Sequence, residues 1–103
     1  MKLFLDDERE APDGWIRIYH PDEMIRLLEN GNITHISLDH DLGNDEAGTG
    51  YDVILWIEEA VATRGFNPPQ IKIHSANPSA RIKMELGIAK IQQLAGNSAG
   101  HPE

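Results

Sequence analysis

Ionisable side chains follow short apolar segments at three separate points of this 103-residue chain. Charged groups are rarely buried unless they are paired or hold a metal, so these side chains belong in a polar pocket and not in a core. If the three segments are parallel strands, their polar ends meet at one edge of one sheet. The positions are Asp6 and Asp7 after residues 2–5, Asp39, His40 and Asp41 after residues 36–38, and His74 after residues 71–73.

The carboxylates at these positions have the chemistry of a magnesium site. Magnesium prefers near-octahedral oxygen coordination and takes one or two carboxylates together with waters and a phosphate. We therefore predict a site for Mg²⁺, or for Mn²⁺ in its place. The alternative interpretation is that Asp6 and Asp7 are solvated loop residues or cap a helical turn. The predicted ligands are Asp6, Asp7, Asp39 and Asp41.

Two histidines at the same positions have the chemistry of proton transfer. Imidazole titrates near neutral pH, so His40 and His74 could act as a general acid and a general base. They could also ligate a transition metal, and a single histidine is more often a structural hydrogen-bonding group than a catalyst. Their placement at the ends of two predicted strands favours function, and we predict that both are catalytic.

A third group of residues suits the binding of a phosphate. Ser75 and Asn77 flank the start of a predicted helix that has Pro78 at its first position. The backbone amides and the dipole at such a terminus bind phosphate, and Arg9 and Arg81 are candidates to clamp it bidentately. The simpler alternatives are that Asn77 only caps the helix and that the arginines are ordinary surface residues. We predict a phosphate-binding role for Arg9, Ser75, Asn77 and Arg81.

Net charge and composition restrict the classes of partner. The formal net charge of −8 argues against strong non-specific binding to nucleic acid, which needs a basic face. A small phosphorylated ligand is compatible with this charge where a divalent cation mediates the contact. Cysteine is absent, which excludes disulfides and a thiolate site. No apolar run approaches the roughly 20 residues of a membrane span or suits a signal peptide, so we expect a cytoplasmic protein with no membrane partner. The oligomeric state is not indicated.

The chain suits one compact domain of alternating strands and helices. Short connections predict a mostly parallel sheet of about four strands with helices on both faces, which makes three layers. Ligands in such folds bind beyond the carboxyl ends of the strands, where the polar side chains stand. We expect a domain over residues 1–95 and a flexible tail over residues 96–103. The predicted strands are residues 2–5, 15–19, 33–38 and 71–74, the predicted helices are residues 21–30, 51–64 and 79–95, and residues 6–14 and 43–50 are predicted loops.

Four sequence motifs occur in a fixed order: Leu5-Asp6-Asp7-Glu8-Arg9 with Pro12, Ser37-Leu38-Asp39-His40-Asp41-Leu42-Gly43, Gly48-Thr49-Gly50-Tyr51-Asp52, and His74-Ser75-Ala76-Asn77-Pro78. In this order they resemble the receiver domain of two-component signalling. More closely, they resemble a divergent family known as the cyclic-phosphate-processing receiver domain, over about residues 2–94. The resemblance implies a receiver-like, flavodoxin-like fold that is shortened at the first helix and at the last strand.

The same resemblance implies a function. In receivers the paired acids and the phosphoacceptor bind magnesium, and a hydroxyl residue, here Ser75, contacts the phosphoryl group. The closer family implies a metal-dependent phosphoesterase that acts on a cyclic nucleotide or on a 2′,3′-cyclic phosphate at an RNA terminus. The alternative is a phospho-signalling or binding module with Asp39 as phosphoacceptor, so Asp39 is expected to be a catalytic nucleophile, a metal ligand or both. The lysine that ends the last receiver strand is missing here, which disfavours signalling.

Overall fold

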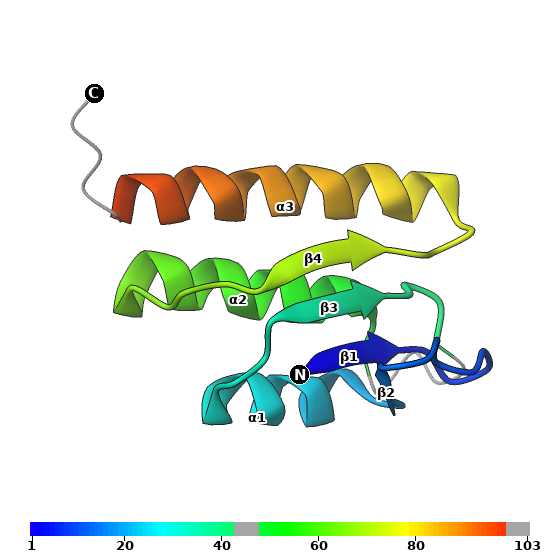
Figure 1. The fold of residues 1–103 in the computed structure, drawn as a ribbon. Helices are drawn as coiled ribbons and strands as arrows, with labels where there is room; N and C mark the ends of the chain where they lie inside the picture. Colours follow the sequence, from blue (N-terminus) through cyan, green and yellow to red (C-terminus); the bar gives the residue numbers. More distant parts are fainter. Residues whose placement is uncertain (43–47, 99–103) are drawn as a thin grey trace.

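Four strands and three helices make up the fold in a computed structural model that describes residues 1–42 and 48–98. All strands are parallel, in the order β2-β1-β3-β4 (Figure 1). The predicted receiver-like α/β fold with a parallel sheet of four strands is therefore confirmed. The elements are β1 (Lys2–Leu5), β2 (Ile16–Ile18), α1 (Pro21–Asn30), β3 (His35–Leu38), α2 (Gly50–Arg64), β4 (Gln70–Ile73) and α3 (Pro78–Ser98).

Local sequence signals explain where the helices begin and end. Pro21 stands at the first position of α1, and Gly31 ends that helix with a positive φ of 89°. Thr49 caps α2 through a capping box with Asp52, and Gly65 closes the helix in the left-handed conformation. Helix α3 continues to Ser98, beyond the predicted end at residue 95. Residues 43–47 of the predicted loop and residues 99–103 of the predicted tail lie outside the described residues.

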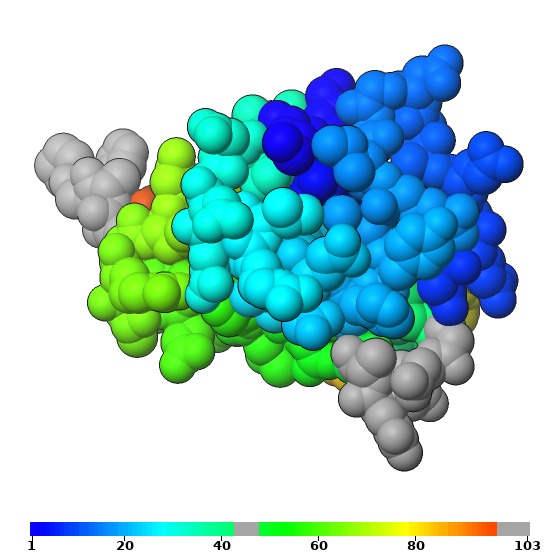
Figure 2. Space-filling view, turned by 90° about the horizontal axis from the view of Figure 1, so that it is seen from below, coloured from blue at the N-terminus to red at the C-terminus, as the bar shows by residue number. Residues whose placement is uncertain are grey.

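The hydrophobic core lies between one face of the sheet and the three helices. Leu3, Leu5, Ile36 and Leu38 point into it from the central strands and are fully buried. Helix α2 packs against both α1 and α3, so the three helices form one layer. In Figure 1 no helix passes in front of the strands, and Figure 2 shows α1 between the N-terminal segment on one side and α2 on the other.

The predicted third layer is wrong for the described residues, because every helix packs on the same face of the sheet. Right-handed crossovers explain this arrangement. The connections from β2 to β3 and from β3 to β4 run in the same direction across the sheet, so α1 and α2 fall on one face. Only the connection from β1 to β2 runs the other way, and residues 6–15 contain no helix. Within the part of the chain that the structure describes, no helix therefore covers the second face of the sheet.

No helix among the described residues combines the length and the apolar character that a membrane span requires.

Candidate functional site

The strand register brings Asp6, Asp39 and His74 into one row. Leu5 is aligned with Leu38, and Leu38 with Ile73, so the next residue of each strand follows in line. The backbone ladder continues through this row, since Asp39 N–H donates to Leu5 O at 3.1 Å and His74 N–H donates to Leu38 O at 2.9 Å. The predicted convergence of acidic and imidazole side chains at the carboxyl edge of the sheet is present.

These three side chains form a compact cluster with the chemistry of a cation site. One ligand atom from each of Asp6, Asp39 and His74 lies within 4.8 Å of the other two. The Asp6 carboxylate is 1% exposed, and its Oδ2 lies 3.1 Å from His74 Nε2. Of the predicted ligands, Asp7 and Asp41 are not part of this group. Their roles in metal binding stay predictions.

The loop after β1 holds the Asp6 carboxylate in its ionised form. Asp6 Oδ1 accepts hydrogen bonds of 2.8 Å from the backbone N–H groups of Glu8 and Arg9. Burial alone would raise the pKa of Asp6, but these two hydrogen bonds and His74 outweigh it and hold the pKa below its ordinary value. The Arg9 guanidinium lies 3.9 Å from Asp6 Oδ2 and donates to His74 O at 2.8 Å, so it lies beside the cluster. Its role in clamping a phosphate stays a prediction.

The pKa of Asp39 is shifted in the opposite direction to the pKa of Asp6. Burial and then the neighbouring Asp6 carboxylate raise its pKa, because both disfavour a second negative charge at this point. Helix α2 closes tightly over the same residue. A Cβ on Gly50, the first residue of α2, would lie 2.1 Å from Asp39 O, so only glycine permits this approach. The Asp6 and Asp39 carboxylates repel each other, and a cation bound between them would relieve this repulsion.

His74 is fixed on three sides. Its Nε2 faces Asp6, its Nδ1 lies 2.8 Å from Ser37 Oγ, and its ring stacks on Phe4 with centroids 4.1 Å apart. Burial lowers the pKa of the imidazole, although Asp6 and Asp39 act in the opposite sense, so the neutral form is favoured. A neutral imidazole with one nitrogen toward carboxylates suits a metal ligand whose other nitrogen is held by a hydroxyl, here that of Ser37.

His40 is arranged differently and suits proton transfer better. Its Nδ1 lies 2.9 Å from Asp41 Oδ1, which lowers the pKa of Asp41, and its Nε2 has no hydrogen-bond partner among the described residues. Asn77 Nδ2 also donates to Asp41 Oδ1, at 3.5 Å. An imidazole oriented by a carboxylate, with its other nitrogen available, is the usual arrangement of a general acid or base. This pairing gives Asp41 a role in orienting His40.

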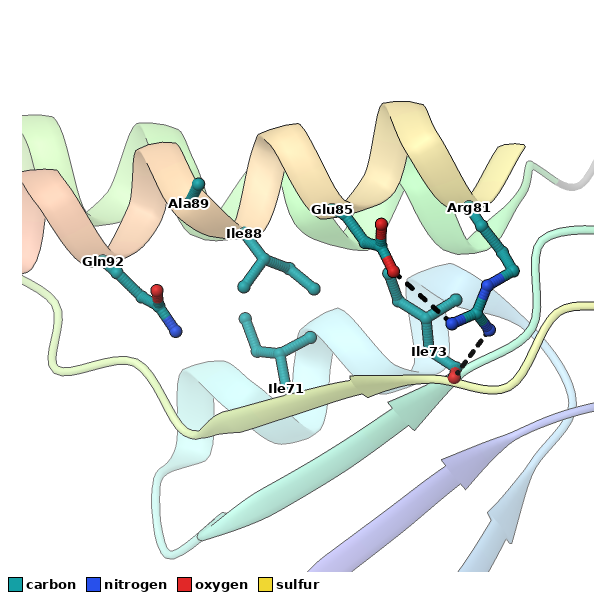
Figure 3. A pocket seen from close by; sticks show the side chains of 7 residues that line it. All are labelled: Ile71, Ile73, Arg81, Glu85, Ile88, Ala89 and Gln92. Atoms are coloured by element: carbon teal, nitrogen blue, oxygen red, sulfur yellow. Dashed lines mark hydrogen bonds and ion pairs between the residues drawn. The ribbon is translucent and has the colours of Figure 1, made fainter. Parts of the chain in front are cut away.

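The start of α3 places the predicted phosphate-binding residues close to His74. Asn77 caps the helix, since its Oδ1 accepts from Ala80 N–H at 3.1 Å, and Ser75 Oγ accepts from Asn77 N–H at the same distance. The Arg81 guanidinium donates to the carbonyls of Ile73 and Ser75 and pairs with Glu85. Figure 3 shows it between Glu85 and the end of β4, at a pocket that Arg81, Glu85 and Gln92 line together with apolar residues of β4 and α3. These contacts of Arg81 connect the first turns of α3 to the end of β4.

The donor set of the cluster fits a divalent cation. Two carboxylates suit Mg²⁺ and Mn²⁺ equally, whereas an imidazole nitrogen is a more usual ligand for a transition metal. Ligand atoms around an ion at about 2.1 Å are separated by roughly 3–4 Å, which is near the spacing found here. Asp6 and Asp39 would hold such an ion, with His74 beside them.

The sequence analysis missed the residues that support the cluster. Ser37 and Phe4 orient His74. Gly50 allows the close approach of α2 to Asp39. Tyr19 lies next to Asp6 in the same row, because Leu5 is aligned with Ile18. Ser37 carried a visible signal, since it is a polar residue at an interior position of an otherwise apolar strand. Phe4 carried none, and Gly50 was visible only as part of a sequence motif, because their contacts depend on elements far apart in the chain.

A family model described as "Cyclic-phosphate processing Receiver domain" matches residues 1–90, which is most of the chain. No curated protein and no solved structure matches the chain significantly.

Proposed function

This chain belongs to the family of cyclic-phosphate processing receiver domains, and on that premise we propose that it is a metal-dependent phosphoesterase that opens a cyclic phosphate. The proposed substrate is a 2′,3′-cyclic phosphate on a nucleotide or at an RNA terminus. The observation that carries the proposal is the cluster of Asp6, Asp39 and His74, whose ligand atoms lie within 4.8 Å of one another at the carboxyl edge of the sheet.

The proposed reaction is hydrolysis at phosphorus. The oxygen of a water molecule bonds to phosphorus as that water gives up a proton. The bond from phosphorus to one ribose oxygen breaks, and that oxygen takes up a proton to leave a phosphomonoester. A divalent cation bound by Asp6 and Asp39 would neutralise charge on the phosphoryl oxygens and make water more acidic. The side chains of the protein would position the substrate and transfer the protons.

Each neighbouring side chain then has a defined task. His74 orients the cluster through Asp6 and Ser37. His40, oriented by Asp41, would give a proton to the leaving ribose oxygen. Arg9 and the N-terminus of α3 at Asn77 supply positive charge and N–H donors for the phosphoryl oxygens.

Turnover of a 2′,3′-cyclic nucleotide with Mn²⁺ or Mg²⁺, followed by ³¹P NMR, tests the proposal. We expect conversion to the phosphomonoester by the unaltered chain, and a fall of about 10²-fold or more in kcat for His40→Ala. Asp39→Asn should abolish turnover while circular dichroism remains unchanged. Absence of turnover with every 2′,3′-cyclic phosphate tried, or full activity in both variants, would reject the proposal.

A phosphoacceptor role for Asp39 is the second candidate. The receiver element of the family description and the position of Asp39 next to Asp6 support it. Incubation with acetyl phosphate or beryllofluoride separates the two functions. A stoichiometric adduct at Asp39 without turnover of cyclic phosphates would favour signalling.

A further inference from the structure

One face of the sheet carries no helix among the described residues. Because side chains alternate along a strand, residues on this face are those opposite to the core positions. We call this surface the open face. Its strand positions include Lys2 and Phe4 in β1, Arg17 in β2, His35 and Ser37 in β3, and Lys72 in β4.

The open face gathers positive charge in an acidic chain. Lys2, Arg17 and Lys72 come from three different strands, and none of them pairs with a carboxylate of the described residues within 4 Å. No acidic residue occupies a strand position on this face, although the whole chain has a net charge of −8. The charge of this surface therefore complements an anionic partner.

Aromatic rings stand among these cations. Tyr19 is 47% exposed, and the Arg17 guanidinium lies over its ring, 4.6 Å from the ring centroid. Trp15 is half-buried against Phe4 and His35, with Lys2 Nζ 5.8 Å from its ring centroid. Aromatic rings and arginine planes interleaved with cations are the groups on which the bases of single-stranded nucleic acid stack.

The open face is continuous with the acid and imidazole cluster. Arg17 Nε donates to Asp6 O at 3.1 Å, and Phe4 stacks on His74. By strand rise, the row of Arg17 and Lys72 lies about 7 Å from the cluster row, and the row of Lys2 lies about 13 Å from it. A nucleoside 2′,3′-cyclic phosphate bound at the cluster has no further phosphate to place on Lys2 and Lys72, whereas a longer strand has.

We propose that the open face binds the single-stranded RNA that leads to the terminal cyclic phosphate. The substrate is then the end of an oligonucleotide. The base next to the cluster stacks on Tyr19 and Arg17, and upstream phosphates contact Lys72 and Lys2. This inference rests on the proposed function for the identity of the terminus, but the binding surface has its own test.

Fluorescence anisotropy with 5′-labelled ribonucleotides that end in a 2′,3′-cyclic phosphate tests binding, with EDTA present so that metal-dependent turnover does not interfere. We expect a hexanucleotide to bind at least tenfold more tightly than a dinucleotide. The double variant Lys2→Ala/Lys72→Ala should remove this difference and lower the slope of log affinity against log salt by about 1.4, because two phosphate contacts are lost. Tyr19→Ala should weaken hexanucleotide binding roughly tenfold, and Tyr19→Phe should not.

The matched control is Lys83→Ala/Lys90→Ala, which removes two lysines from α3 on the helical side of the molecule. It should leave affinity and salt slope unchanged. Equal affinity for the two lengths, or an equal loss in the control, would overturn the inference. So would self-association in sedimentation velocity that the Lys2→Ala/Lys72→Ala variant abolishes, because it would assign the open face to a second copy of the chain. Since the assay involves no turnover, failure of the proposed enzyme activity leaves its result intact.

Discussion

Asp39 carries a charge that the fold disfavours, because burial and the Asp6 carboxylate both raise its pKa. Sites that bind cations commonly hold such repulsion in the metal-free state, and removing it stabilises the protein at the expense of function. We predict that Asp39→Asn raises the free energy of unfolding by about 0.5–1 kcal/mol without metal. Urea denaturation measures this. A loss of stability in this variant would show that Asp39 is held by attractive contacts instead.

His74 makes stability depend on pH. Its pKa in the folded chain lies below the ordinary value of 6.5, so as pH falls the unfolded chain binds the proton first. The stability that neutral His74 contributes is therefore fully present above pH 6.5 and is lost as pH falls through that range. We predict that the free energy of unfolding decreases between pH 7.5 and pH 5.5, and that His74→Gln, which keeps a donor toward Asp6, reduces this dependence. Equal pH dependence in the two proteins would contradict the burial of a neutral imidazole.

At the residue scale, the cluster could be predicted because its members have the side-chain types of a cation site. The pairing of His40 with Asp41, and the turning of Arg81 toward Glu85, could not. Both depend on rotamers and on neighbours that the sequence does not place. Ser37 is visible in the sequence as a polar residue in an apolar strand, but its hydrogen bond to His74 could not be predicted.

The contact between Asp39 and the first turn of α2 sets the geometry of the site at the scale of elements. A Cβ at Gly50 would meet the Asp39 carbonyl and push the helix or the strand end away. We predict that Gly50→Ala destabilises the fold by about 1–3 kcal/mol, as overpacking does, and weakens metal binding because Asp39 moves. Thermal and urea unfolding with and without Mn²⁺ measure both effects.

Gly96 in α3 is the matched control, since a Cβ there meets nothing within 4 Å. Gly96→Ala should stabilise the chain by about 0.5–1 kcal/mol through helix propensity. Equal tolerance of alanine at residues 50 and 96 would contradict the close approach of α2 to Asp39.

Element positions could be predicted well from proline, glycine and capping signals, and α1 and α2 lie where these signals stand. The end of α3 was placed too early, because the small and polar residues from Gly96 onward were assigned to a flexible tail, whereas the helix runs to Ser98. An exposed glycine lowers helix stability without stopping a helix that is packed along its length.

The described residues form two layers, whereas we predicted three, and this is the largest difference between the prediction and the structure. Alternating elements predict a covered sheet, but the face that a helix covers depends on the direction of each crossover. The strand order shows that the connection from β1 to β2 alone would supply the second face. That connection is a loop, so the open face is left to polar and aromatic side chains such as Lys72 and Trp15.

Binding of Mn²⁺, measured through the electron paramagnetic resonance of the free ion, tests the central claim most directly. The account predicts one Mn²⁺ per chain, loss of this binding in Asp39→Asn, and its retention in Asp41→Asn, because Asp41 is paired with His40 outside the cluster. Failure of the unaltered chain to bind Mn²⁺, or undiminished binding in Asp39→Asn, would contradict the account.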